Sequence, residues 1–219
     1  MDFFFRPLWR ENAAPAPGLI GNFASYVTGL PDGSVFRLNY DGPDTIKKDD
    51  EQMAGTTASI ATVIDYSDMR VSDQPLESLV ALTIGSGIAM TIFDPVPPVG
   101  GLLNFILPNS TQIESLKDQH SAYIFADTGI TAFLEALSEM GARHERMKVV
   151  VAGGARVLGQ IDTIDIGSRN HDVAKKVLSQ YKIPIFYEDV GGNFSRSLSL
   201  KIGDGISTLK IIGRGEVKI

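Results

Sequence analysis

The residues best suited to chemistry lie in the run LTIGSGIA, residues 82–89. Two apolar, β-branched stretches flank a Gly-Ser-Gly turn, a pattern that predicts two strands joined by a tight corner with Ser86 exposed. A serine nucleophile needs a base within hydrogen-bond reach and a group that orients this base. His120 is the nearest histidine in the sequence, and it lies in a polar loop. Because the spacing assigns no base, a structural corner is favoured over a serine hydrolase.

Metal and thiol chemistry find little support in the composition. The chain has no cysteine and three histidines, His120, His144 and His171. No two of them have the helical or hairpin spacing of metal ligands, so we expect no metal and no cofactor. His144 follows a predicted helix and His171 lies at the start of another, so both are expected at the surface. The glycine pairs at 153–154 and 191–192 are expected to make tight turns, because no phosphate-loop pattern surrounds them.

The bulk composition is that of one ordinary globular domain. With 219 residues, 43% hydrophobic and 21% charged, the chain is long enough for one full core. A net charge of -6 argues against non-specific nucleic-acid binding, which needs a positive surface. No apolar stretch is long enough to cross a bilayer, and the N-terminus is a poor signal peptide, so we expect a cytoplasmic protein.

The elements that must position the corner are mostly strands. Strands are predicted over residues 79–84, 87–93, 99–107, 147–151 and 185–187, and a hairpin over 198–212. One helix is expected to be capped by Asp127-Thr128 and to stop at Gly141, and a second to be capped by Asn170. We therefore predict an α+β fold of packed mixed β-sheets with helices on the outer face.

The first 60 residues differ from the rest of the chain. They contain five of the prolines, a charged run and an aromatic cluster near the N-terminus. This composition predicts an extension over residues 1–60, followed by the main domain over 61–219. The extension is expected to pack on its own domain. A structural role, in which this arm mediates self-association, is the alternative.

Several segments of the main domain resemble one family in sequence and in order. They are residues 83–89 with Asp94-Pro95, 100–110, 123–128, 140–142, 151–155, 166–170, 188–193 and 195–197. Together they resemble the bacterial chemoreceptor glutamine deamidase CheD, over about residues 61–219. This resemblance implies a thiolate that attacks a receptor glutamine, the loss of ammonia, and the release of a glutamate by water.

The resemblance also implies three catalytic positions, and this chain differs at each of them. The family has Gly-Ser-Cys for the nucleophile, His-x-x-Leu-Pro for the base, and a threonine six residues before the cysteine. These positions hold Gly87, Asn104 and Ala81 here. Glycine offers no nucleophile, asparagine takes up no proton near neutral pH, and alanine makes no side-chain hydrogen bond. We therefore predict a catalytically inactive pseudo-deamidase, not an enzyme, that acts as a protein-binding or regulatory module.

The remnant of the catalytic pocket is the expected binding site. Its candidate residues surround the corner and the end of the following strand: Thr83, Gly85, Ser86, Gly87, Asn104 and Ser110. Gly87 is also a candidate for a positive φ. By resemblance, the partners to consider are chemoreceptor helices or a CheC-type phosphatase. A residual deamidase that uses Ser86 or Thr83, with His120 recruited in space, is the competing hypothesis.

Overall fold

The computed structural model describes residues 59–112, 122–156 and 165–219. The predictions for the N-terminal extension and for His120 lie outside these residues. The boundary at residue 60 therefore stays a prediction.

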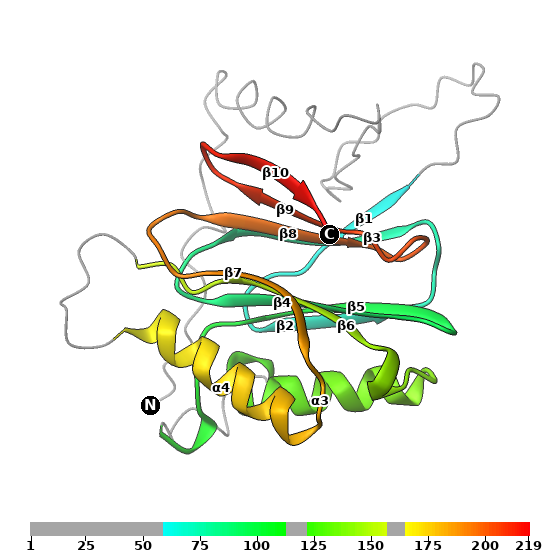
Figure 1. Cartoon of the computed structure of the whole chain (residues 1–219), viewed down its shortest axis with the longest axis horizontal. Coiled ribbons are helices and arrows are strands. Elements are labelled where there is room, and N and C mark those ends of the chain that lie inside the picture. The colour runs from blue at the N-terminus through cyan, green and yellow to red at the C-terminus, as the bar shows by residue number, and fades with distance from the viewer. Residues whose placement is uncertain (1–58, 113–121, 157–164) are drawn as a thin grey trace, which may run out of the picture. The chain divides into compact units, whose positions relative to one another are not determined.

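In the described part of the chain, ten strands form two mixed five-stranded sheets (Figure 1). The first sheet has the order β1 (Ile60–Val63), β3 (Glu77–Ile84), β8 (Arg196–Lys201), β9 (Ser207–Ile211) and β10 (Gly215–Lys218). The second has the order β2 (Asp68–Ser72), β5 (Pro98–Phe105), β4 (Ile88–Pro95), β6 (Lys148–Gly153) and β7 (Ile185–Val190). The pairs β1–β3 and β6–β7 are parallel, and the other pairs are antiparallel.

Two long helices, α3 (Ala126–Glu139) and α4 (Ile166–Gln180), cover the face of the second sheet that points away from the first (Figure 1). Short 3-10 turns are η1 (Ser110–Gln112), η2 (Ala122–Ile124) and η3 (His144–Arg146). This arrangement confirms the predicted α+β fold with helices on one outer face. The unit β6–α4–β7 joins two parallel strands through a helix, which the sequence analysis did not anticipate.

Side-chain alternation along the central strand β4 divides the core into two layers. Ile88, Met90 and Ile92 pack against the helices, whereas Ala89 and Phe93 pack between the two sheets. Every residue of β4 except the last is buried, because helices cover one face and the other sheet covers the opposite face. Such a strand reads as a continuous apolar run, which is why the sequence predicted it well.

Both predicted helix caps are wrong. The helix α3 begins at Ala126, and the Asp127 carboxylate accepts hydrogen bonds from the Ser110 backbone N–H and hydroxyl, each at 3.0 Å. Asn170 lies inside α4, whose N-cap is Asp165. Asp165 caps the helix by accepting a 2.9 Å hydrogen bond from the Ser168 N–H. The stop at Gly141 is confirmed, since α3 ends just before it and Gly141 has a φ of 91°.

Within the described residues, no helix combines the length and apolar character needed to cross a membrane.

A buried carboxylate, Asp94, ties the end of β4 to the segment that leads into β6. Its side chain is 0% exposed and accepts hydrogen bonds from Arg146 Nε at 2.8 Å and from Arg146 Nη2 at 2.6 Å. The backbone N–H groups of Val96 and Arg143 also donate to it, each at 2.8 Å. Burial by itself would raise the pKa of Asp94, but these donors together outweigh it and hold the pKa below its usual value.

We expect Asp94→Asn to lower the free energy of unfolding by about 2 kcal/mol, because an amide offers one acceptor oxygen where the buried carboxylate accepts from Val96, Arg143 and Arg146 with two. The folded-state pKa of Asp94 lies below its unfolded value, so its contribution is present above the unfolded value of about 4 and is lost as the pH falls below it. Urea unfolding between pH 3 and pH 7 should therefore show a shallower loss of stability at low pH in the variant than in the wild type. Equal pH slopes would contradict this role.

Candidate functional site

The corner between β3 and β4 is held in place through its three carbonyl groups. The Gly85 carbonyl accepts a hydrogen bond from the Ala155 N–H at 2.8 Å, and the Gly87 carbonyl accepts one from the Gly154 N–H at 2.7 Å. The Ser86 carbonyl accepts a 3.1 Å hydrogen bond from Nδ2 of Asn170. All three donors come from the end of β6 and from α4, so this unit fixes the conformation of the corner.

Gly87 is buried, and the space where a side chain would lie is closed. A Cβ atom added to it would lie 2.9 Å from the Phe105 carbonyl oxygen and 3.1 Å from Cγ2 of Ile106. Gly87 is not among the residues with a positive φ, so the proposed left-handed conformation is wrong, and it is Thr83 that has a φ of 55°. Packing against the end of β5, and not backbone conformation, therefore restricts the side chain at position 87.

Ala81 and Asn104 lie between the two sheets. Ala81, in β3, is fully buried among apolar side chains. Asn104, in β5, pairs with Ala89 of β4 and is 1% exposed. Its Nδ2 lies 3.5 Å from the Ile64 carbonyl oxygen, and its Oδ1 has no hydrogen-bond partner. Among the described residues, no carboxylate or imidazole makes a hydrogen bond to this amide.

The other candidate residues divide into two groups. Ser86 and Gly85 are half-buried at the corner, and Thr83 is exposed just before it. The Thr83 carbonyl accepts a 3.0 Å hydrogen bond from the Tyr66 hydroxyl, which helps to hold its unusual backbone conformation. The hydroxyl of Ser110, in contrast, binds Asp127 and therefore has a structural role at the start of α3.

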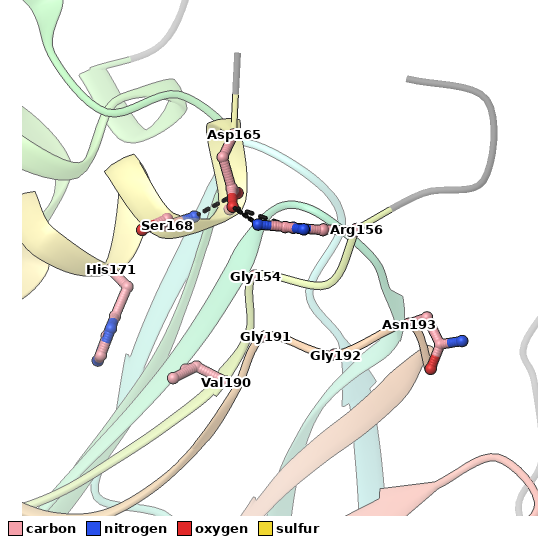
Figure 2. A pocket seen from close by; sticks show the side chains of 10 residues that line it. Gly154, Arg156, Asp165, Ser168, His171, Val190, Gly191, Gly192 and Asn193 are labelled. Carbon is pink, nitrogen blue, oxygen red and sulfur yellow. Dashed lines mark hydrogen bonds and ion pairs between the residues drawn. The ribbon is translucent and has the colours of Figure 1, made fainter. Parts of the chain in front are cut away.

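A separate pocket of about 470 Å³ lies beyond the ends of β6 and β7, beside the first turns of α4 (Figure 2). Gly154, Gly191 and Gly192 form part of its wall, and none of the six candidate residues lines it. Gly154, Gly191 and Gly192 all have positive φ values, which confirms the turns predicted at both glycine pairs.

Asp165, at the rim of this pocket, forms an ion pair with Arg156 at 3.2 Å. The hydrogen bond from the Ser168 N–H, more than the Arg156 contact, lowers the pKa of Asp165.

His171 lines this pocket and is half-buried, so it is less exposed than the prediction of a surface residue implied. Its side chain is 13% exposed, and Nε2 lies 2.8 Å from Oε2 of Glu188. His144 lies beyond the other end of α4, where its ring meets that of Tyr181 edge to face. In the described part of the chain, no three His, Asp or Glu side chains form a group that could hold a metal ion.

Sequence reasoning did not identify Asn170 as part of the site. The signal that could have found it is its place on the apolar face of α4, at helical spacing from Ala174, Val177 and Leu178. A buried amide on such a face needs hydrogen-bond partners from another element. The partners are the corner and the residue after β5, which no local pattern could reveal.

Comparisons with known proteins identify the family. The family model described as CheD chemotactic sensory transduction matches residues 106–211, a range that begins just after Asn104. Three relatives named as probable chemoreceptor glutamine deamidase CheD match over most of the chain. That of Symbiobacterium thermophilum is 33% identical over 156 residues, covering 70% of this chain and 93% of the relative. That of Solibacter usitatus is 36% identical, and the match covers 65% of this chain and 84% of the relative. That of Clostridium novyi is 35% identical, and the match covers 69% of this chain and 93% of the relative.

These relatives correct one prediction. The chain was expected not to be an enzyme, but the proteins that it matches are named as glutamine deamidases, which are enzymes. Nothing in the described residues shows that this chain is inactive. Its lack of cysteine means only that a thiol is not its nucleophile. The extent and identity of these matches support a chemotaxis-related function and establish that the chain belongs to the CheD family.

Proposed function

We propose that this chain binds a protein partner of the chemotaxis apparatus at the corner formed by residues 85–87, as a binding or regulatory module. The observation that carries the proposal is the anchoring of all three corner carbonyls by β6 and α4. A site fixed in this way binds without first having to order its own backbone. Chemoreceptor helices are the first candidate partner, because the relatives are named for chemoreceptors. A CheC-type phosphatase is the second.

Two backbone N–H groups of the corner take no part in this anchoring. The C=O and N–H of a trans peptide point in opposite directions, so the N–H groups of Ser86 and Gly87 point away from the donors that hold Gly85 and Ser86. Neither N–H has an acceptor among the described residues. We expect the carboxamide oxygen of a partner's glutamine to be that acceptor.

Deamidation through a hydroxyl is the second candidate function. The observation that favours it is the Ser86 hydroxyl, which is half-buried at the corner and makes no hydrogen bond within the described residues. Its oxygen would bond to the carboxamide carbon, its proton would pass to the departing nitrogen, and ammonia would leave an ester. Water would then hydrolyse the ester to a carboxylate and restore the hydroxyl. The exposed residue Thr83, which lies in β3 shortly before the corner, carries the alternative hydroxyl.

Partner binding should depend on access to the corner. We expect the wild-type chain to retain a cytoplasmic chemoreceptor fragment or a CheC-type phosphatase in a pull-down assay, and Ser86→Trp to weaken this at least about tenfold by covering the corner. Lys210→Trp is the matched control, because Lys210 is exposed on β9. Retention of neither partner by the wild type would count heavily against the proposal.

Ammonia release tests the second candidate. With a receptor fragment that carries glutamine, hydroxyl-dependent deamidation predicts release that falls at least about a hundredfold in Ser86→Ala, because the nucleophile is lost. Thr83→Val is the parallel variant for the alternative hydroxyl. Release unchanged in both variants, or no release from the wild type, would retire a mechanism through these hydroxyls.

The closed space at Gly87 gives a further expectation. Gly87→Ala should lower the free energy of unfolding by about 1–3 kcal/mol, because its Cβ would press on the Phe105 carbonyl oxygen. Urea unfolding measures this change. Ser86→Ala, which removes a hydroxyl without a described partner, should stay within about 0.5 kcal/mol of the wild type. A Gly87→Ala protein as stable as the wild type would show that the corner has room for a side chain.

A further inference from the structure

One buried side chain connects helix α4 to both segments of the corner region. Asn170 is 0% exposed, and its Nδ2 donates hydrogen bonds to the Ser86 carbonyl oxygen at 3.1 Å and to the Ile106 carbonyl oxygen at 3.0 Å. A primary amide has two N–H donors, so both protons of Asn170 are used. The two acceptors are 20 residues apart in the sequence, before β4 and after β5.

These bonds fix the distance between two carbonyls that lie just outside the β4–β5 ladder, whose last pair is Ile88 with Phe105. The two N···O distances are near 3 Å, and the two N–H bonds of an amide lie roughly 120° apart. Together they hold the two carbonyl oxygens roughly 5 Å apart. Ser86 leads directly into Gly87, and Ile106 follows Asn104 by two residues. Asn170 therefore sets the spacing between the corner and the end of β5.

The orientation of the Asn170 amide costs free energy, because it leaves one buried atom unpaired, and this indicates that its two hydrogen bonds are important for the fold. Oδ1 of Asn170 is buried and has no hydrogen-bond partner. Burying an acceptor without a donor costs free energy. Turning the amide over would place this oxygen against two carbonyl oxygens, so the unpaired acceptor is the price of holding both carbonyls.

We propose that Asn170 is the positioning residue of the binding corner. The proposal rests on the proposed function for its binding consequence, but its structural part stands on the contacts of Asn170 alone. The other two anchors, Gly154 and Ala155, donate through the backbone and would survive most substitutions. Among the described residues, Asn170 is the one side chain that donates to both segments.

Two substitutions of Asn170 test the proposal by amide hydrogen exchange. Asn170→Ala removes both donors, and Asn170→Asp keeps the shape but turns a carboxylate oxygen toward two carbonyl oxygens. We expect the N–H groups of Gly154 and Ala155, which bond to the corner carbonyls, and that of Leu107 to exchange at least about tenfold faster in both variants, while those at the centre of β4 change less than about threefold.

Val177→Ala is the matched control. Val177 lies on the same buried face of α4 but about 10 Å farther along the helix, seven residues on. We expect it to raise exchange around its own contacts and to leave the corner unchanged. If Asn170→Ala raises exchange equally across the corner and the centre of β4, its role is merely structural and the proposal is overturned. If Asn170→Asp does not fold, the exchange rates of Asn170→Ala alone test the proposal.

Partner affinity separates this proposal from the proposed function. If the wild-type chain binds its partner, Asn170→Ala should weaken binding at least about tenfold, whereas Val177→Ala should leave it unchanged. Unchanged affinity in Asn170→Ala would overturn the positioning role in binding. If the wild type binds neither candidate partner but exchange at the corner responds as expected, the positioning of the corner is supported and only the proposed function fails.

Discussion

The structure around the site depends on one constraint: the backbone carbonyls of Gly85, Ser86 and Gly87 all accept hydrogen bonds from another part of the fold. Their donors are Gly154 and Ala155, which directly follow β6, and Asn170, which lies in α4. The β6–α4–β7 unit thereby fixes a corner that belongs to β3 and β4. The anchoring satisfies these carbonyls, whereas the N–H groups of Ser86 and Gly87 have no acceptor among the described residues.

The three positions to which the family resemblance assigns catalytic residues lie in the packed interior. Ala81 completes the apolar layer between the sheets, and Gly87 lets the end of β5 approach the corner closely. Asn104 keeps a polar side chain there, with an unpaired oxygen. Since the chain has no cysteine, no thiol acts at these positions. Membership of a family of named deamidases nevertheless keeps hydroxyl-based chemistry at Ser86 open to experiment.

Much of the fold could be predicted, because its main elements carry strong local patterns. The strands of the sheet centres and the apolar face of α3 are long and regular, and the hairpin of β8 and β9 has a clear turn. The short strands β1, β2 and β10 were missed, since each has mostly half-buried or exposed residues and depends on a neighbour for its pairing. Two helix starts were also misplaced, because Asp127 and Asn170 bind distant segments and not the helix ends.

The site was predictable only in part for the same reason. The corner and its glycines are visible in the sequence, but its anchors and the closed space at Gly87 come from contacts across the fold. The central claim is that the unpaired N–H groups of Ser86 and Gly87 receive a partner's carboxamide oxygen. Titrating the isotope-labelled chain with a glutamine-bearing chemoreceptor helix, and following the amide resonances by NMR, tests it most directly. We expect the Ser86 and Gly87 resonances to shift first and furthest; shifts confined to other surfaces, with these two unmoved, would contradict the account.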